Sequence, residues 1–369
     1  MFEVLEAAPP DPILGLTEAF KKDSNPGKIN LGAGVYKDAR GQTPTLSSVR
    51  KAEQRVLEAN PGKAYLPISG APEFATATQR LMLGSDHKVV KEARAQTAHT
   101  PGGTGALRVA ADFIKQNYPK ARLWLSDPTW ENHVKVFSAA GLEVLKYPYY
   151  DAASKGLAFD AMAGALSQVP ATDVVLLHAC CHNPSGVDPS LDQWKKIEAI
   201  RAKQGFLPFF DFAYQGFGDG LEEDAQAVRH FADHASEMLI ASSYSKNFGL
   251  YNERVGALTL IGASAEAADR AFGHVKLSVR ANYSNPPSHG ASVVTTILND
   301  ATLRAEWEAE LRQMCGRIHQ MRELFVKQLA AAGIKQDFSF ITKQKGMFSF
   351  SGLSRAQVDQ LRERFAVYA

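Results

Sequence analysis

Residues 173–186, DVVLLHACCHNPSG, carry the pattern that decides the fold. Val174–Leu177 is an unbroken apolar run, which is typical of a strand buried on both faces by flanking helices. A polar tail from His178 to Gly186 follows, where such a strand ends. Because open α/β sheets bind ligands beyond the carboxyl ends of their strands, this tail is a candidate part of a functional site.

Similar short runs alternate with helical patterns from about residue 100 to residue 262. The expected strands are Arg122–Ser126, Asp173–Ala179, Leu207–Phe212, Met238–Ser242 and Arg254–Leu260. The expected helices, which show apolar residues at a period near 3.6, are Gly105–Gln116, Glu131–Ala140, Leu191–Lys203 and Ser264–Val279. This alternation predicts an α/β fold with a mostly parallel sheet.

The C-terminal third has a different pattern. Apolar residues recur in steps of three or four from Leu303 to Leu329, which predicts one long amphipathic helix that ends near Gly333 and could bridge two lobes. Phe338–Phe350 is expected to form two strands, and residues 354–365 a helix. We interpret this end of the chain as part of a separate, smaller α+β lobe.

Composition narrows the class of protein. A chain of 369 residues, 45% of them hydrophobic, favours two domains over one. The net charge of +2 gives no field that would recruit nucleic acid or an anionic membrane, and no apolar stretch has the length of a membrane helix. Three cysteines, two of them adjacent, argue against a disulfide framework and favour a reducing compartment, so we expect a cytoplasmic protein.

Lys246 is the candidate nucleophile. It lies in SSYSKNFGLYNERVG, just past a predicted strand, with Arg254 eight positions later. An amine that is desolvated near a cation loses proton affinity and can attack a carbonyl, as Schiff-base chemistry requires. A lone lysine of this kind is most often a solvated loop residue, so the interpretation depends on its neighbours.

The run TPGGTGALR, residues 100–108, indicates a phosphate site. Gly102, Gly103 and Thr104 directly precede a predicted helix, whose backbone N–H groups and positive end can hold a phosphate dianion. The run lacks the GK[ST] of a P-loop and the GxGxxG of a dinucleotide fold, and glycines before helices are mostly turns. Together with Ser243, Arg254 and Lys246, it indicates a phosphorylated aldehyde cofactor.

Two further strand ends offer partners for such a cofactor. Asp211 can pair with a pyridinium nitrogen, and Tyr214 can donate to a phenolate oxygen, to which Asn183 adds a second donor. Without the other motifs, Asp211 and Tyr214 would be as well explained by an ordinary aspartate at a strand end beside a packed tyrosine. A metal site at Cys180 and Cys181 is disfavoured, because adjacent cysteines lack the spacing of zinc motifs.

Trp130 and Arg280 complete the candidates. Trp130, in SDPTWENH, could stack on a cofactor ring or belong to the core. Arg280 lies where a helical pattern meets a proline-rich turn, and its guanidinium could bind a carboxylate with two hydrogen bonds, although a bare arginine is by default surface charge.

Taken together, these blocks resemble the class I aspartate aminotransferases of the pyridoxal phosphate (PLP) fold type I, through nearly the whole chain and in the order of that family. The blocks are DPILGL at Asp11, INLGAGVYKD at Ile29, TPGGTGALRVAADF at Thr100, HNPSG at His182, DFAYQGF at Asp211, SYSKNFGLYNERVGA at Ser243 and RANYSNPP at Arg280.

The resemblance implies a role for each candidate. Lys246 would bind pyridoxal 5'-phosphate and move the proton between the substrate carbon and the cofactor. Asp211 would keep the ring nitrogen protonated, and Tyr214 would hydrogen-bond the phenolate oxygen. The implied cofactor-binding residues are Gly102, Gly103, Thr104, Trp130, Asn183, Asp211, Tyr214, Ser243, Lys246 and Arg254. The implied substrate-binding residues are Gly34, Trp130, Asn183 and Arg280, the last contributed by the partner chain. Tyr65, counted with Lys246, Asp211 and Tyr214 as catalytic, would reach the cofactor phosphate from the second subunit, and no metal is implied.

The resemblance also implies an architecture. A large domain, residues 43–313, would hold a mostly parallel seven-stranded sheet flanked by helices. A smaller α+β domain would combine residues 11–42 and 314–369, and residues 1–10 would form an arm across the partner of a homodimer. The family pattern continues past Ala369 with an arginine for the substrate α-carboxylate and a final helix. Were that segment absent, substrate binding should suffer more than cofactor binding.

The predicted reaction is therefore amino transfer between L-aspartate and 2-oxoglutarate, giving oxaloacetate and L-glutamate. An aromatic amino acid aminotransferase of the same family is the nearest alternative. A PLP-dependent decarboxylase or lyase on this fold, which Arg280 argues against, and a non-catalytic α/β protein are the others.

Overall fold

The computed structural model describes residues 2–7, 12–32, 34–60 and 62–369. The chain divides into two compact units, one formed by residues 1–35 and 351–369 and the other by residues 36–350. Residues 1 and 8–10 of the predicted N-terminal arm, and Asp11 at the start of the DPILGL block, lie outside the described residues.

The first unit is built around a short parallel pair of strands. Strand β1 (Ile29–Asn30) pairs in parallel with β11 (Val367–Tyr368). The hydroxyl of Tyr368 donates to Oδ2 of Asp23 at 2.7 Å, and its ring meets Phe20 edge to face. The other elements of this unit are η1 (Phe2–Val4), α1 (Pro12–Lys22) and α13 (Arg355–Phe365), the last confirming the helix predicted over residues 354–365.

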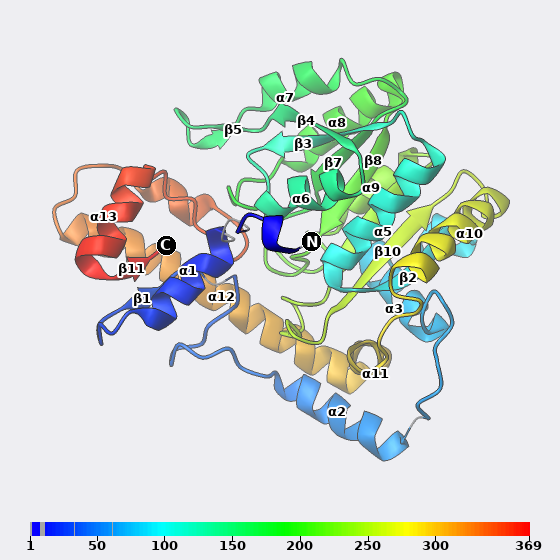
Figure 1. Cartoon of the computed structure of the whole chain (residues 1–369), viewed down its shortest axis with the longest axis horizontal. Coiled ribbons are helices and arrows are strands. Elements are labelled where there is room, and N and C mark those ends of the chain that lie inside the picture. The colour runs from blue at the N-terminus through cyan, green and yellow to red at the C-terminus, as the bar shows by residue number, and fades with distance from the viewer. Residues whose placement is uncertain (1, 8–11, 33, 61) are drawn as a thin grey trace. The chain divides into compact units, whose positions relative to one another are not determined.

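A seven-stranded sheet organises the second unit (Figure 1). Its strand order is β2-β10-β9-β8-β7-β3-β4, and all strands run parallel except β10, which is antiparallel to both of its neighbours. The strands are β2 (Ala95–Pro101), β3 (Arg122–Asp127), β4 (Glu143–Pro148), β7 (Val174–His178), β8 (Leu207–Phe212), β9 (Met238–Ser243) and β10 (Val255–Ile261). The mostly parallel α/β sheet is thus confirmed. A separate hairpin pairs β5 (Tyr150–Asp151) with β6 (Gly156–Leu157).

Helices cover both faces of this sheet, because its central strands are apolar on both sides. Leu176 and Phe209 belong to one apolar cluster, which includes residues of α5 (Gly102–Asn117), α6 (Glu131–Ala139) and α10 (Ala265–Asn282). Their strand neighbours Val175 and Phe210 belong to a second cluster on the opposite face. That cluster includes residues of α2 (Ser47–Ala59), α3 (Pro72–Leu83), α4 (Lys88–Lys91), α7 (Phe159–Leu166), α8 (Leu191–Gln204), α9 (Gln226–His234), α11 (His289–Asn299) and α12 (Ala301–Ala331).

The predicted strands and helices of this unit match the observed ones to within about three residues at each end, α12 included. Strands β2 and β4 were missed. Their sequences, AQTAHTP and EVLKYP, lack a continuous apolar run, because each lies at an edge of the sheet.

The two strands predicted over Phe338–Phe350 are wrong. The segment contains the short 3-10 helix η2 (Ser339–Lys343) followed by irregular chain. Its backbone groups are satisfied by side chains instead of a ladder. The amide of Gln344 bonds both the N–H and the carbonyl of Phe350, and the guanidinium of Arg322 donates to the carbonyls of residues 344, 346 and 348.

None of the described helices is both long enough and apolar enough to cross a membrane.

Candidate active site

The carboxyl ends of the parallel strands bring the predicted residues to one edge of the sheet. Gly102 directly follows β2, Asn183 follows β7, Tyr214 follows β8 and Lys246 follows β9. Since β10 is antiparallel, its first residue lies at this same edge, directly after Arg254. The sheet therefore gathers segments that are more than 140 residues apart in the chain.

Three glycines open a cradle beside Arg254. Gly102 has φ of +72°, and a Cβ built there would lie 2.4 Å from Nη2 of Arg254. A Cβ on Gly103 would lie 3.0 Å from the Cβ of Ser243, and one on Gly256 only 2.3 Å from the carbonyl carbon of Gly102. This close approach sets the first turn of the 16-residue helix α5 against a guanidinium and a hydroxyl, which suits a phosphate dianion.

Lys246 lies one short turn beyond β9, among buried neighbours. Its Nζ lies 5.2 Å from the centre of the Tyr214 ring. Burial lowers the pKa of the Lys246 amine, the negative charge of Asp211 opposes that shift, and Arg254 adds to it. The amine is therefore easier to deprotonate than an ordinary lysine, as a nucleophile toward an aldehyde requires.

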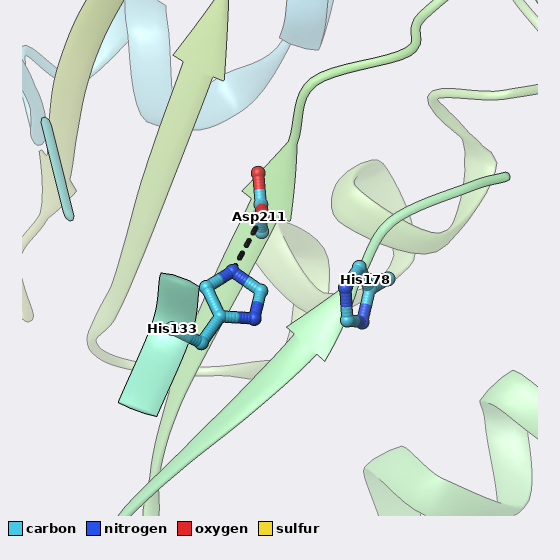
Figure 2. A group of neighbouring side chains, drawn as sticks. All are labelled: His133, His178 and Asp211. Carbon is cyan, nitrogen blue, oxygen red and sulfur yellow. Dashed lines mark hydrogen bonds and ion pairs between the residues drawn. The ribbon is translucent and has the colours of Figure 1, made fainter. Parts of the chain in front are cut away.

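Asp211, in β8, is an enclosed carboxylate held by a histidine. Its Oδ2 lies 2.9 Å from Nε2 of His133 on α6 (Figure 2). The Nδ1 of His133 lies 2.8 Å from the hydroxyl of Thr129. Burial acts to raise the pKa of Asp211, but the hydrogen bond with His133, together with the positive charge of Lys246, lowers it below the ordinary value. Asp211 is thus ionised and accepts, so Nε2 of His133 carries the hydrogen.

His133 was not among the residues predicted from the sequence. It lies three positions after Trp130, in the first turn of α6, and is fully buried. The Trp130 ring meets it edge to face, with centroids 5.2 Å apart. Because His133 and Asp211 are 78 residues apart, only the packing of α6 against the sheet reveals the pair.

Tyr214 and Asn183 are hydrogen-bonded to each other. Burial raises the pKa of Tyr214 well above its ordinary value, although the side-chain hydrogen bond with Asn183 opposes the shift. The hydroxyl therefore keeps its proton and is available as a donor. Next to Asn183, the His182 ring stacks on Tyr149 at 3.8 Å and lies within hydrogen-bonding distance of the hydroxyls of Ser126 and Ser185, which fixes the turn.

Possible metal ligands gather at two places among the described residues. One group is His133, His178 and Asp211, where burial lowers the pKa of His178 to about 3 (Figure 2). The other is Cys180, Cys181 and Asp224. The Asp224 carboxylate accepts the backbone N–H groups of residues 216, 218 and 219, and burial raises the pKa of both thiols, that of Cys181 to about 12. The carboxylates of Asp211 and Asp224 are thus held by hydrogen bonds within the protein, whereas neither ring nitrogen of His178 is hydrogen-bonded among the described residues.

The predicted substrate residues are less enclosed. Arg280 lies in the last turn of α10, exposed, and its guanidinium bonds the hydroxyl of Ser284. Tyr65 is 92% exposed. Gly34 belongs to the first unit, where it follows β1.

An anion cradle, an activated amine and a buried carboxylate at one edge of an α/β sheet define an enzyme that holds a phosphorylated cofactor on a lysine. The model of the family "Aminotransferase class I and II" matches residues 26–369, and the chain belongs to this family.

Relatives and solved structures agree over the whole chain. The chain is 59% identical to an aspartate aminotransferase of Salmonella typhi and 47% identical to an aromatic-amino-acid aminotransferase of Escherichia coli, covering 100% of this chain and 93% of each relative. Its structure is similar to that of an aromatic-amino-acid aminotransferase from Burkholderia pseudomallei covalently bound to pyridoxal phosphate. The TM-score is 0.97 at 49% identity, over 100% of this chain and 92% of the other. The fold is that of the PLP type I aminotransferases.

Proposed function

We propose that the protein is a pyridoxal 5'-phosphate-dependent aminotransferase that exchanges the amino group between L-aspartate and 2-oxoglutarate, giving oxaloacetate and L-glutamate. The observation that carries the proposal is the placement of Lys246 beside Asp211 and Tyr214, at the edge where the glycine cradle opens. Relatives named aspartate aminotransferase at 59% and 58% identity support this choice of substrates.

The residues present fit this cofactor. Gly102, Gly103, Thr104, Ser243 and Arg254 would hold its phosphate. Asp211 would pair with the ring nitrogen, Tyr214 and Asn183 would hydrogen-bond the phenolate oxygen, and Trp130 would stack on the ring. When bound, the cofactor supplies an electron sink for the bond that breaks.

Lys246 then has two tasks. Its amine, whose pKa is lowered by burial, would be the group that holds the cofactor through its aldehyde. When it is not bound to the cofactor, the same amine would serve as the base that moves the proton of the substrate carbon. Asp211 would keep the cofactor ring nitrogen protonated during both tasks, because its carboxylate is ionised and hydrogen-bonded to His133.

Substrate selection rests on Arg280, with Gly34, Asn183 and Trp130 lining the substrate. Arg280 would clamp the distal carboxylate from the second subunit of a homodimer, and Tyr65 would reach the phosphate in the same way. The exposure of both side chains in the single chain supports this division.

Mixed dimers test the shared site. In a mixed dimer of Lys246→Ala and Arg280→Ala chains, one site collects both changes and the other neither. Random mixing of the inactive Lys246→Ala protein with the weakly active Arg280→Ala protein should thus restore about a quarter of the wild-type activity on aspartate. If mixing restores nothing while the chains do exchange, Arg280 and Lys246 act from one chain.

Relative rates separate aspartate from aromatic substrates. We expect the full chain to form oxaloacetate and L-glutamate from L-aspartate and 2-oxoglutarate at a higher kcat/KM than it shows with tyrosine or phenylalanine. A preference for the aromatic amino acids would favour an aromatic amino acid aminotransferase instead, the activity for which the 47% identical relative is named. Decarboxylation without amino transfer would overturn both.

Two expectations complete the proposal. The large domain would span residues 43–313, and the small domain residues 11–42 and 314–369. A cytoplasmic location is supported by Cys180, Cys181 and Cys315, which are free thiols.

A further inference from the structure

Arg322, on α12, is a buried cation surrounded by backbone carbonyls. Its side chain is almost fully buried, the residue being 4% exposed, and no carboxylate among the described residues pairs with it. Its guanidinium donates instead to the carbonyls of Gln344, Gly346 and Phe348, at 2.7, 2.6 and 2.6 Å, and its Nε to the hydroxyl of Ser349 at 3.2 Å. A buried charge is costly unless it is fully hydrogen-bonded, so the chain must wrap around this one.

The wrapped segment, residues 344–350, is closed by Gln344. The Gln344 amide donates to the carbonyl of Phe350 at 3.0 Å and accepts its N–H at 2.8 Å. The segment thus has no strand partner, and side chains satisfy the carbonyls of residues 344, 346, 348 and 350. One guanidinium and one amide therefore supply the side-chain hydrogen bonds that shape its inner side.

The outer side of this segment abuts the proposed cofactor site. The N–H of Lys345 donates to the carbonyl of Gly186 at 2.7 Å, and a Cβ on Gly346 would lie 2.6 Å from the Cβ of Cys181. The two contacted residues, Cys181 and Gly186, lie before and after Asn183 in the chain. The Phe348 ring meets the Tyr214 ring edge to face, with centroids 6.2 Å apart. The segment thus touches both sides of the pair that would hydrogen-bond the phenolate oxygen.

We infer that Arg322 is a positioning residue of the cofactor site. Through the Gln344–Phe350 segment it sets the Tyr214 ring and the Cys181–Gly186 turn, and so aims the two donors at the phenolate oxygen. The inference rests on the proposed function, and it assigns to Arg322 no contact with substrate or cofactor.

Arg322→Lys is the sharpest variant. Lysine keeps the charge, but its single ammonium cannot reproduce a planar fork that reaches three carbonyls. Arg322→Met keeps the apolar stem and removes the charge, and it serves as a second variant. Arg312→Lys is the matched control, because Arg312 lies on the same helix, is exposed and, among the residues that the structure describes, forms its ion pair with Glu308.

The readout is the pH midpoint at which the visible absorbance band of the cofactor-loaded protein changes. A phenolate oxygen that loses donors is less stable as an anion, so Arg322→Lys should move the midpoint by about half a unit or more. It should also lower kcat by about tenfold with a smaller change in KM. In a background that carries both Tyr214→Phe and Asn183→Ala, the shift caused by Arg322→Lys should largely vanish, because both donors through which it acts are gone. Arg312→Lys should shift nothing.

Equal shifts in both backgrounds, or no shift in a folded Arg322→Lys protein, would overturn the inference while leaving the proposed function intact. A wild-type protein that shows no band with added cofactor would remove the proposed function and this inference with it.

Discussion

His133 and Asp211 form a buried pair, with 2.9 Å between Nε2 and Oδ2, and this hydrogen bond helps to keep the pKa of the Asp211 carboxylate low although burial acts to raise it. Asp211→Asn tests the consequence. A neutral amide cannot hold a proton on the cofactor ring, so kcat should fall roughly 10²–10³-fold while the cofactor still binds, because the phosphate cradle is untouched. Steady-state rates and the absorbance of the loaded protein check this. Asp192→Asn, at an exposed carboxylate, should change neither.

The cradle predicts a paired result for two glycines. Gly102→Ala places a Cβ 2.4 Å from Nη2 of Arg254 and forces a non-glycine residue to φ of +72°. The backbone strain costs about 1–2 kcal/mol, and Arg254 must also move. Because about 1.4 kcal/mol corresponds to a tenfold change in the dissociation constant, cofactor binding should weaken by tenfold or more. Gly164→Ala, in α7, meets no atom within 4 Å and should leave the dissociation constant unchanged. Comparable weakening in both variants would mean that the cradle does not bind the phosphate.

Arg280 should determine the preference for substrates with a distal carboxylate, and should have little effect on the rate with other substrates. Arg280→Ala should reduce kcat/KM for aspartate and glutamate by about 2 kcal/mol or more, roughly thirtyfold, because the distal carboxylate loses a bidentate partner. Aromatic substrates, which carry no such carboxylate, should lose much less. Equal losses on both substrate classes would remove the specificity argument.

His99 makes the folded protein sensitive to acid. It is fully buried in β2 with neither ring nitrogen hydrogen-bonded among the described residues, and burial lowers its pKa from 6.5 to about 4. Between pH 6.5 and about 4, His99 is therefore protonated in the unfolded chain but neutral in the folded one. The free energy of unfolding thus falls as the pH drops from 6.5 toward 4. Near pH 4.5 this one residue should account for about 2–3 kcal/mol.

Urea unfolding of His99→Leu measures that contribution. The variant should lose less unfolding free energy than wild type between pH 7 and 4.5, whatever its stability at pH 7. Parallel pH curves for the two proteins would show that His99 is not the cause.

The sequence predicts the sheet and the site edge because both depend on local pattern. Val174–Leu177 indicates a buried strand wherever it lies, and Lys246, Asp211, Asn183 and Gly102 each lie at or just beyond a strand end. Parallel strands bring such ends together. The resemblance to aminotransferases then supplies roles that spacing alone leaves open.

What the sequence does not predict depends on contacts between distant segments. His133 meets Asp211 across 78 residues, and Arg322 lies in a helical pattern that gives no sign of the carbonyls around it. The apolar, β-rich GMFSF run indicates a strand, yet Arg322 and Gln344 satisfy its backbone in irregular chain instead. The spacing of apolar residues in the sequence does not show that side chains will replace the hydrogen bonds of a strand pair.

Reduction of the cofactor-loaded protein with borohydride, followed by peptide mapping, tests the central proposal most directly. The account predicts that the cofactor is fixed on the peptide that contains Lys246, and that Lys246→Ala fixes none. Cofactor recovered on another lysine, or a wild-type protein that fixes none, would contradict it.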